Sequence, residues 1–228
     1  MIPVDPSSAA SVVLPIGIDL AATVVFSITG AMVAIRRHYD PVGLFVLALV
    51  CGLGGGLLRD GVFIQAGPPA AMRDASYMVA VLVGCMVALL FFPHAERLSK
   101  PFLILDAVGI AAYGVVGASK AWEAGLAIPA CIFVGVVNAA GSSLIRDVLV
   151  REEPLIFKPG QFYVIASLLG VTTFTLLAVV LHAPVVAAAL AGIAITFVCR
   201  LLAIVFDWKT RSVVRPGPSS VARGRRRT

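Results

Sequence analysis

The chain contains 228 residues, of which 60% are hydrophobic and 13% charged, and its formal net charge at pH 7 is +6. Its mean hydropathy is +1.01. A soluble domain carries about 25% charged residues and about 45–50% apolar ones, so this composition excludes a water-soluble enzyme. The apolar residues come in runs of about 20 with short polar breaks, which excludes a disordered chain and predicts an all-α integral membrane protein with several spans.

Seven apolar runs are each near the ~20 residues that cross the hydrocarbon core of a bilayer. In chain order the expected spans are 16–35, 42–66, 76–92, 102–120, 125–149, 162–181 and 185–206. Proline stands in the breaks, as in Asp40-Pro41 and Lys100-Pro101, where it ends helices. The first residues, 1–15, lack the basic region of a signal peptide, so the first span is expected to be retained after an extracytoplasmic segment.

The positions of Lys and Arg predict the orientation, because cytoplasmic flanks are enriched in both. Of the 18, thirteen fall on the side of the C-terminus and only Arg73 and Lys120 fall on the other. Arg59, Arg146 and Arg200 lie within or at the ends of spans. We therefore expect the N-terminus outside and the C-terminus in the cytoplasm. The basic tail, 207–228, either binds anionic lipid headgroups or only enforces this topology.

An internal repeat sets the expected architecture. A shift of 87 positions, which places Asp19 on Asp106, also aligns GGGLLRD (54–60) with GSSLIRD (141–147). Each copy contains three spans, so the second must enter the membrane the opposite way up. The sequence thus predicts two inverted three-helix repeats, 16–92 and 102–181, followed by a seventh helix, 185–206.

Small residues crowd the second and fifth spans at equivalent positions, and we expect a pore-forming kink or break there. Consecutive glycines weaken a helix by roughly 1 kcal/mol each against alanine, and symmetric broken helices often mark a permeation site. The alternative is close packing between helices, which small residues also serve. The candidate kink residues are Gly54, Gly55, Gly56, Gly141, Ser142 and Ser143.

Charged residues next to these segments form the second group of candidates. An embedded charge is costly unless it is paired or wetted, so we expect Asp19 to pair with Arg59 and Asp106 to pair with Arg146. Inversion places the first pair in the outer half of the membrane and the second in the inner half. Asp60 and Asp147 directly follow the two arginines. We call the expected cluster of Asp19, Arg59 and Asp60 the outer station, and that of Asp106, Arg146 and Asp147 the inner station.

Scattered polar residues are weaker candidates for a pore lining: Ser27, Thr29, Ser119, Lys120 and Asn138. Membrane hydroxyls often bond instead to the carbonyl four residues earlier. The four cysteines each stand alone in apolar runs and are interpreted as small core residues. We find no metal-ligand cluster, no nucleophile–base pair and no nucleic-acid signature, and therefore expect no enzyme, no metal, no cofactor and no nucleic-acid partner.

The seven spans, the inverted halves and the doubled GGGxxRD-type motif resemble the trimeric intracellular cation (TRIC) channel family, in its prokaryotic branch. The likeness covers roughly residues 16–206. It implies a homotrimer in the inner membrane of a prokaryote, with a pore in each subunit for K⁺ or Na⁺ between the second and fifth helices. It also implies that the motif residues belong to the kinks and to the pore or its lipid-facing surroundings, and a bound phospholipid is consistent with the embedded arginines.

Two other functions compete with the channel. The duplicated domain also resembles proteins described as glycine transporters, so a carrier for glycine or another small amino acid is the main alternative. A lipid-binding or scaffolding protein is a third. Cation conduction also meets a difficulty, because Arg59, Arg146 and Lys120 repel cations unless neighbouring carboxylates neutralise them.

Overall fold

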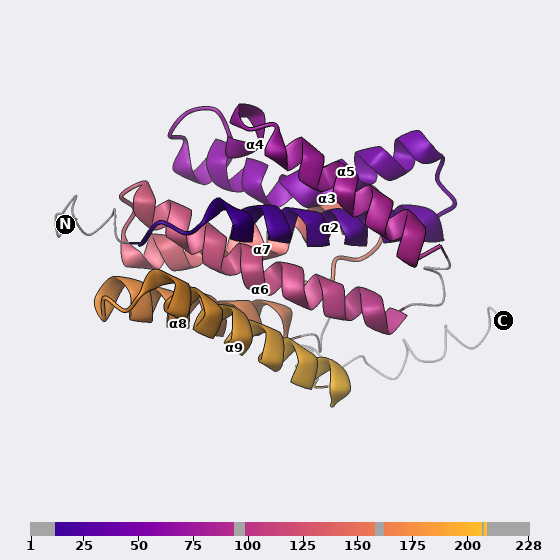
Figure 1. Cartoon of the computed structure of the whole chain (residues 1–228). Helices are drawn as coiled ribbons and strands as arrows, with labels where there is room; N and C mark the ends of the chain where they lie inside the picture. The colour runs from indigo at the N-terminus through magenta and orange to yellow at the C-terminus, as the bar shows by residue number, and fades with distance from the viewer. Residues whose placement is uncertain (1–11, 94–98, 158–161, 207, 209–228) are drawn as a thin grey trace, which may run out of the picture.

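A computed structural model gives the structure of residues 12–93, 99–157, 162–206 and 208. Most of the predicted extracytoplasmic segment, 1–15, and of the basic tail, 207–228, lies outside these described residues. Figure 1 shows a bundle of long helices packed roughly along one direction, with the start of α2 (Ile16–Arg36) and the end of α9 (Val185–Val205) at opposite ends of the bundle.

The first half of the chain contains α2 (Ile16–Arg36), α3 (Pro41–Leu58), α4 (Ala70–Arg73) and α5 (Ser76–Phe91). Helix α3 continues directly into a π-helical turn, η2 (Arg59–Ile64). The second half contains α6 (Ser99–Glu123), α7 (Ile128–Leu149) and α8 (Tyr163–Thr175), which continues into η4 (Leu176–Val180). Helix α9 (Val185–Val205) follows.

The described residues form an all-helical membrane fold. Within the described ranges, six helical segments are long and apolar enough to cross a membrane. Helix α5 is apolar but shorter, with 16 residues where the sequence predicted a span over 76–92. The expected spans agree with the helices to within a few residues, because proline at N1 of α3 and proline before α9 begin helices where the sequence places them. The short helix α4 lies in a break between two expected spans and was not predicted.

Helix α6 occupies the centre of the bundle and packs against α2, α7, α8 and α9. Its apolar window is 78% buried, the largest share among the six candidate spans, whereas that of α9 is only 33% buried. Glycines allow the close approach: a Cβ on Gly117 would lie 2.7 Å from the Cβ of Asn138 on α7. The second half is therefore built around α6, and α9 covers it from outside.

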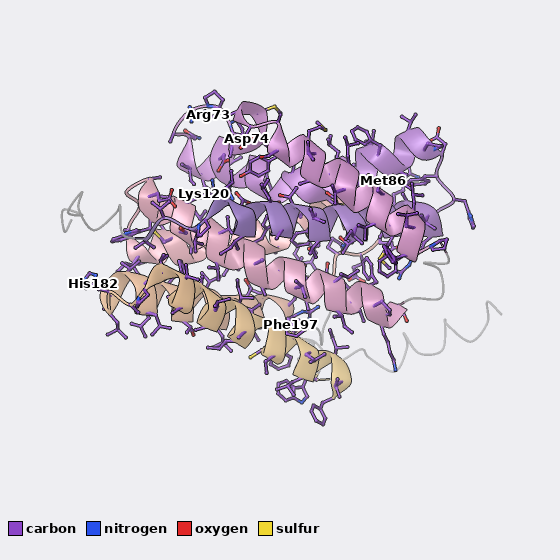
Figure 2. The ribbon with its side chains drawn as sticks, viewed as in Figure 1. Arg73, Asp74, Met86, Lys120, His182 and Phe197 are labelled. Carbon is purple, nitrogen blue, oxygen red and sulfur yellow. The ribbon has the colours of Figure 1, made fainter. Side chains whose placement is uncertain are left out.

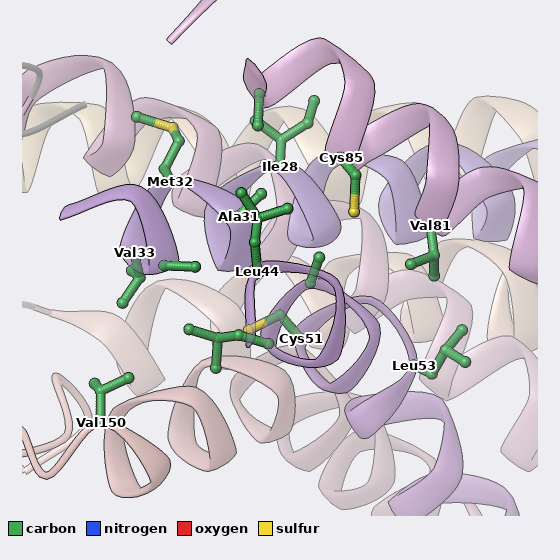
Figure 3. Close-up of a cluster of buried hydrophobic side chains, with 14 of the residues drawn as sticks. Ile28, Ala31, Met32, Val33, Leu44, Cys51, Leu53, Val81, Cys85 and Val150 are labelled. Atoms are coloured by element: carbon green, nitrogen blue, oxygen red, sulfur yellow. The ribbon is translucent and has the colours of Figure 1, made fainter. Parts of the chain in front are cut away.

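A separate apolar core forms where α2, α3 and α5 meet (Figure 3). Ile28 and Met32 of α2, Cys51 of α3, and Val81 and Cys85 of α5 are buried together there. All four cysteines are free thiols. Cys51 and Cys85 pack as small apolar side chains in this core, as the sequence indicated.

The helices do not break at the small-residue segments, and the kink expected there stays a prediction. The α-helical assignment runs without interruption through Gly54–Gly56 in α3 and through 141–143 in α7. In the first copy the departure from α geometry begins only at Arg59. In the second copy α7 stays α-helical to Leu149. Ser142 and Ser143 stand there in place of two glycines of the first copy, and serine destabilises a helix less than glycine does.

Candidate functional site

The inner station is a fully buried cluster of charges around Asp106. Arg146 Nη1 of α7 lies 3.1 Å from Asp106 Oδ1 of α6, and Arg146 Nε donates to Asp147 Oδ1 at 2.9 Å. Arg200 Nη2 of α9 lies 4.0 Å from Asp106 Oδ2. Arg146 and Asp106 are 1% and 0% exposed. Two carboxylates and two guanidinium groups thus offset one another inside the bundle.

The outer station repeats this plan around Asp19, at the start of α2. Arg59 Nη2 lies 3.9 Å from Asp19 Oδ2, and Arg59 Nε donates to Asp60 Oδ1 at 2.6 Å. Lys120 Nζ of α6 lies 3.6 Å from Asp19 Oδ2, and its side chain is 30% exposed. The Tyr77 hydroxyl of α5 donates to Asp19 Oδ2 at 2.7 Å. Here too, two carboxylates face two cations.

The two Arg-Asp motifs anchor the chain that follows them. Asp60 Oδ2 accepts a hydrogen bond from the Ala70 backbone N–H at 3.0 Å, and Asp147 Oδ2 accepts one from the Leu155 N–H at 3.2 Å. Each aspartate therefore binds both its own arginine and the next segment of backbone; Asp60 accepts from Arg59 with both oxygens, and Asp147 accepts from Arg146 with Oδ1. These two roles of the aspartate explain why the Arg-Asp pair occurs at the end of a span in both halves.

The outer station opens into a cavity of about 370 Å³ at the end of the bundle where α2 begins. Asp60, Tyr77, Lys120, Arg73 and Asp74 line it, and Figure 2 shows the last three of these at the same end of the molecule. Lys120 also lines a second cavity of about 140 Å³, together with Asp19 and Ser119. The outer charges thus have access to water.

A cavity of about 220 Å³ lies near the inner station. Arg36, Arg37, Phe102, Arg146 and Glu152 are among the residues that line it. Arg36 and Arg146 both stack on the Phe102 ring, with the Cζ atoms 4.6 and 4.9 Å from its centroid. Neither Asp106 nor Arg200 lines this cavity, so the inner station is less accessible than the outer one.

An aromatic layer from α2 and α6 separates the two stations. The rings of Phe26 and Tyr113 lie 5.1 Å apart, centroid to centroid, and both are buried. The Tyr113 hydroxyl donates to the Gly52 carbonyl of α3 and lies 2.8 Å from Thr23 Oγ1. Together these contacts close the interior between the outer and the inner charges.

The small-residue segments join α3 to α7. The Gly55 N–H donates to Ser142 Oγ at 3.0 Å, and a Cβ on Gly55 would lie 2.7 Å from the Asn138 carbonyl oxygen. A Cβ on Gly141 would lie 3.4 Å from the Gly55 Cα. The alternative interpretation of these residues, close helix packing, is therefore what the structure shows.

The weaker candidates are distributed over different roles. Thr29 Oγ1 donates to the Phe26 carbonyl at 2.8 Å and lies 3.4 Å from Arg146 Nη1, so it joins the inner station. Ser119 donates to the Val12 carbonyl at 2.7 Å beside the outer cavities. Asn138 Nδ2 donates to the Tyr113 carbonyl at 2.6 Å. Ser27 is fully buried, and its Oγ would lie 2.1 Å from a Cβ on Gly52, so it fills space between helices.

Four residues that the sequence did not assign to a site prove to belong to it: Tyr77, Tyr113, Tyr163 and Arg200. The sequence shows Arg200 as a charge inside an apolar span, but it does not indicate the distant Asp106 as its partner. Tyr113 aligns with Phe26 in the repeat. Its additional hydroxyl, inside an apolar helix, was the one sequence feature that could have indicated a role for Tyr113 in the site. Among the described residues, no cluster of His, Cys, Asp or Glu is suited to hold a metal ion.

Comparison with known proteins places these features in a family. The family model described as "Glycine transporter" matches residues 16–93 and again residues 103–179. The UPF0126 inner membrane protein YadS of Escherichia coli is 34% identical over 190 residues, which cover 82% of this chain and 90% of the relative. The TRIC trimeric intracellular cation channel orthologue from Rhodobacter sphaeroides is 34% identical and superposes with a TM-score of 0.76 over 84% of this chain and 97% of its own.

The chain belongs to the TRIC channel family. A second solved structure, described in connection with conductance through TRIC cation channels, has a TM-score of 0.75 at 27% identity and covers 90% of this chain and 100% of its own. The double match of the family model follows the two halves of the sequence repeat. These TRIC structures are described as channels and not as enzymes.

Proposed function

We propose that this protein is a passive channel for monovalent cations, permeable to K⁺ or Na⁺. The observation that carries the proposal is the similarity to two TRIC channel structures over at least 84% of the chain. The all-helical membrane fold and the charged interior support it, because paired ionisable residues inside a bundle often mark an ion pathway.

The proposed route passes through each subunit along the contact between α2, α3, α6 and α7. A cation enters the outer cavity beside Asp60 and Lys120, passes the outer station, and meets the aromatic layer of Phe26 and Tyr113. Beyond that layer lies the inner station, next to the inner cavity lined by Arg146. The route is closed in this conformation, since Phe26 and Tyr113 are 0% and 1% exposed.

The arginines at the two stations would repel a cation, but neighbouring carboxylates neutralise their charge. Asp19 and Asp60 offset Arg59 and Lys120, and Asp106 and Asp147 offset Arg146 and Arg200. A cation therefore meets no net positive charge at either station. Small rearrangements of the ion pairs expose carboxylate oxygens to it. The small-residue segments contribute by letting α3 and α7 approach closely, and α3 changes to a π-helical turn at Arg59, a feature that often occurs at functional sites.

The proposed setting is a homotrimer in a bacterial inner membrane, with the N-terminus outside and the C-terminus in the cytoplasm. The names of the relatives support this assembly and location, and the distribution of Lys and Arg supports the orientation. The proposed inverted arrangement of the two halves agrees with the contacts between equivalent residues, such as Gly55 with Ser142. A phospholipid headgroup near Arg36 and Arg37 fits the basic inner surface.

Planar-bilayer recording of the purified protein in a KCl gradient tests the channel. We expect single-channel steps that reverse near the potassium equilibrium potential. Liposomes that show saturable uptake of labelled glycine, together with bilayers that show no steps, would contradict the channel and support the carrier.

A glycine carrier is the second candidate, and one observation favours it besides the description of the family model. Arg146 Nη2 and Asp106 Oδ2 are both buried and form no hydrogen bond within the described part of the chain. A zwitterion presents one carboxylate and one ammonium group, the two groups that would satisfy these atoms. Equilibrium binding of labelled glycine to the detergent-solubilised protein, compared with R146Q, separates this carrier from the channel.

A further inference from the structure

Helix α9 stands outside the repeated unit, yet it inserts an arginine into the inner station. A Cβ on Gly170 of α8 would lie 1.8 Å from Thr196 Oγ1 and 2.4 Å from the Gly192 carbonyl oxygen, both on α9. This close approach fixes the face of α9 that carries Ala188, Gly192, Thr196 and Arg200, all of which face the bundle. Arg200 is 0% exposed, although only a third of the apolar window of α9 is buried.

The two stations obtain their second cation in different ways. The residue that the repeat places opposite Lys120 is Val33, which has no charge. The inner station therefore lacks the cation that Lys120 supplies to Asp19, and Arg200 from α9 takes its place, 4.0 Å from Asp106 Oδ2. Arg200 thus lies outside the repeated unit and has no counterpart in the first copy.

A tyrosine near each station shows the same difference. Tyr77 of α5 and Tyr163 of α8 begin equivalent helices, and Tyr77 donates to Asp19 Oδ2. Tyr163 instead contacts the Ser143 hydroxyl, and its ring lies under Arg200, with the guanidinium Cζ 4.7 Å from the centroid. The first copy has Gly56 where the second has Ser143, so Tyr77 finds no hydroxyl there. Asp106 Oδ2 accepts no hydrogen bond from the described residues, and Arg200 Nη2 lies 4.0 Å from this oxygen.

We infer that Arg200 is a specificity-determining residue, whose charge sets how strongly the inner station attracts cations. The inference rests on the proposed channel function. With Arg200 present, the charges of Asp106 and Asp147 are matched by Arg146 and Arg200. Without its charge the buried station carries one net negative charge, and in a protein interior a unit charge acts more strongly than it does in water. Lys120 has less influence, because water reaches its 30% exposed side chain.

Reversal potentials in KCl gradients test the inference, because they report ion preference and do not depend on the number of active channels. We expect R200Q to raise the preference for K⁺ over Cl⁻ by at least about twofold relative to the wild type. R200K keeps the charge and is expected to keep the wild-type preference. K120Q removes a cation from the outer station and is expected to have a smaller effect than R200Q.

K100Q is the matched control for net charge. It removes one positive charge from an exposed side chain in the first turn of α6, and it should shift the preference by less than R200Q does. If R200Q does not fold, the same comparison is made between D106N and D106N/R200Q. The double variant removes a buried pair of opposite charges, and it should restore the preference for K⁺ that D106N loses.

The outcomes separate the two proposals. A wild-type protein that carries no current overturns the channel and the role of Arg200 with it. If the wild-type protein conducts but R200Q has the ion preference of the wild type, the role of Arg200 is overturned and the channel stays in place. The same holds if D106N/R200Q has the ion preference of D106N.

Discussion

Gly55 and Ser142 lie 87 positions apart in the chain, and the backbone N–H of the first donates to the hydroxyl of the second at 3.0 Å. The same interval relates Asp19 to Asp106 and Phe26 to Tyr113. Phe26 and Tyr113 also contact each other. Equivalent residues of the two halves therefore meet near the middle of the bundle. Residues close to a two-fold axis contact their own counterparts in this way, which supports the proposed inverted arrangement of the two halves.

G55A tests the packing between α3 and α7. The added Cβ would lie 2.7 Å from the Asn138 carbonyl oxygen, so the helices must separate, and we expect a loss of about 1–3 kcal/mol in stability. Thermal unfolding in detergent measures it. G61A is the control, because a Cβ there meets nothing within 4 Å. Equal unfolding temperatures for the two variants would show that the contact is not close.

Y113F tests the aromatic layer. The variant loses the hydrogen bond to the Gly52 carbonyl and the contact with Thr23 but keeps the ring beside Phe26. Losing a buried hydrogen bond costs about 0.5–1.5 kcal/mol, which should favour the open conformation and raise the open probability roughly two- to tenfold. Single-channel recording measures it. An unchanged open probability would remove Tyr113 from the gate.

D106N tests the inner station. A neutral amide in place of the Asp106 carboxylate would leave Arg146 and Arg200 with one carboxylate fewer in a buried site, so we expect a destabilisation of about 3–5 kcal/mol. The K⁺ current per channel should fall, because the station becomes net positive. The double variant D106N/R146Q should recover part of the lost stability in the same unfolding assay. Additive losses would argue against coupling between the two residues.

D74A tests the start of α5. Asp74 Oδ1 accepts a hydrogen bond from the Ser76 N–H at 2.8 Å, which lowers the pKa of Asp74 below its ordinary value near 3.8. A lowered pKa means that the charged form stabilises the folded state above the pKa of the unfolded chain, and that this contribution disappears as the pH falls through the folded value. D74A should therefore unfold at a lower temperature than the wild type at pH 7.

The comparison at acidic pH provides the check on Asp74. The difference between D74A and the wild type should be constant from pH 7 to about pH 5 and should shrink below the ordinary pKa of about 3.9. A difference that grows with acidity would mean that another group is responsible.

The sequence alone predicts much of the fold, because its signals are local or periodic. Apolar runs and prolines place the helices to within a few residues, since a bilayer demands uninterrupted apolar segments and proline begins or ends helices. The repeat also indicates which charges correspond, and the ion pairs of Asp19 with Arg59 and Asp106 with Arg146 lie where that correspondence puts them.

Only the tertiary structure decides how these elements act. Glycine runs are compatible both with a broken helix and with close packing, and the neighbouring α7, which contacts Gly55 directly, decides for packing. Arg200 and Tyr163 are distant in sequence from Asp106 and carry no motif, so their place in the inner station depends on how α9 and α8 pack against α6. Local propensity determines where helices form, but the partner of a buried charge depends on which helices the packing brings together.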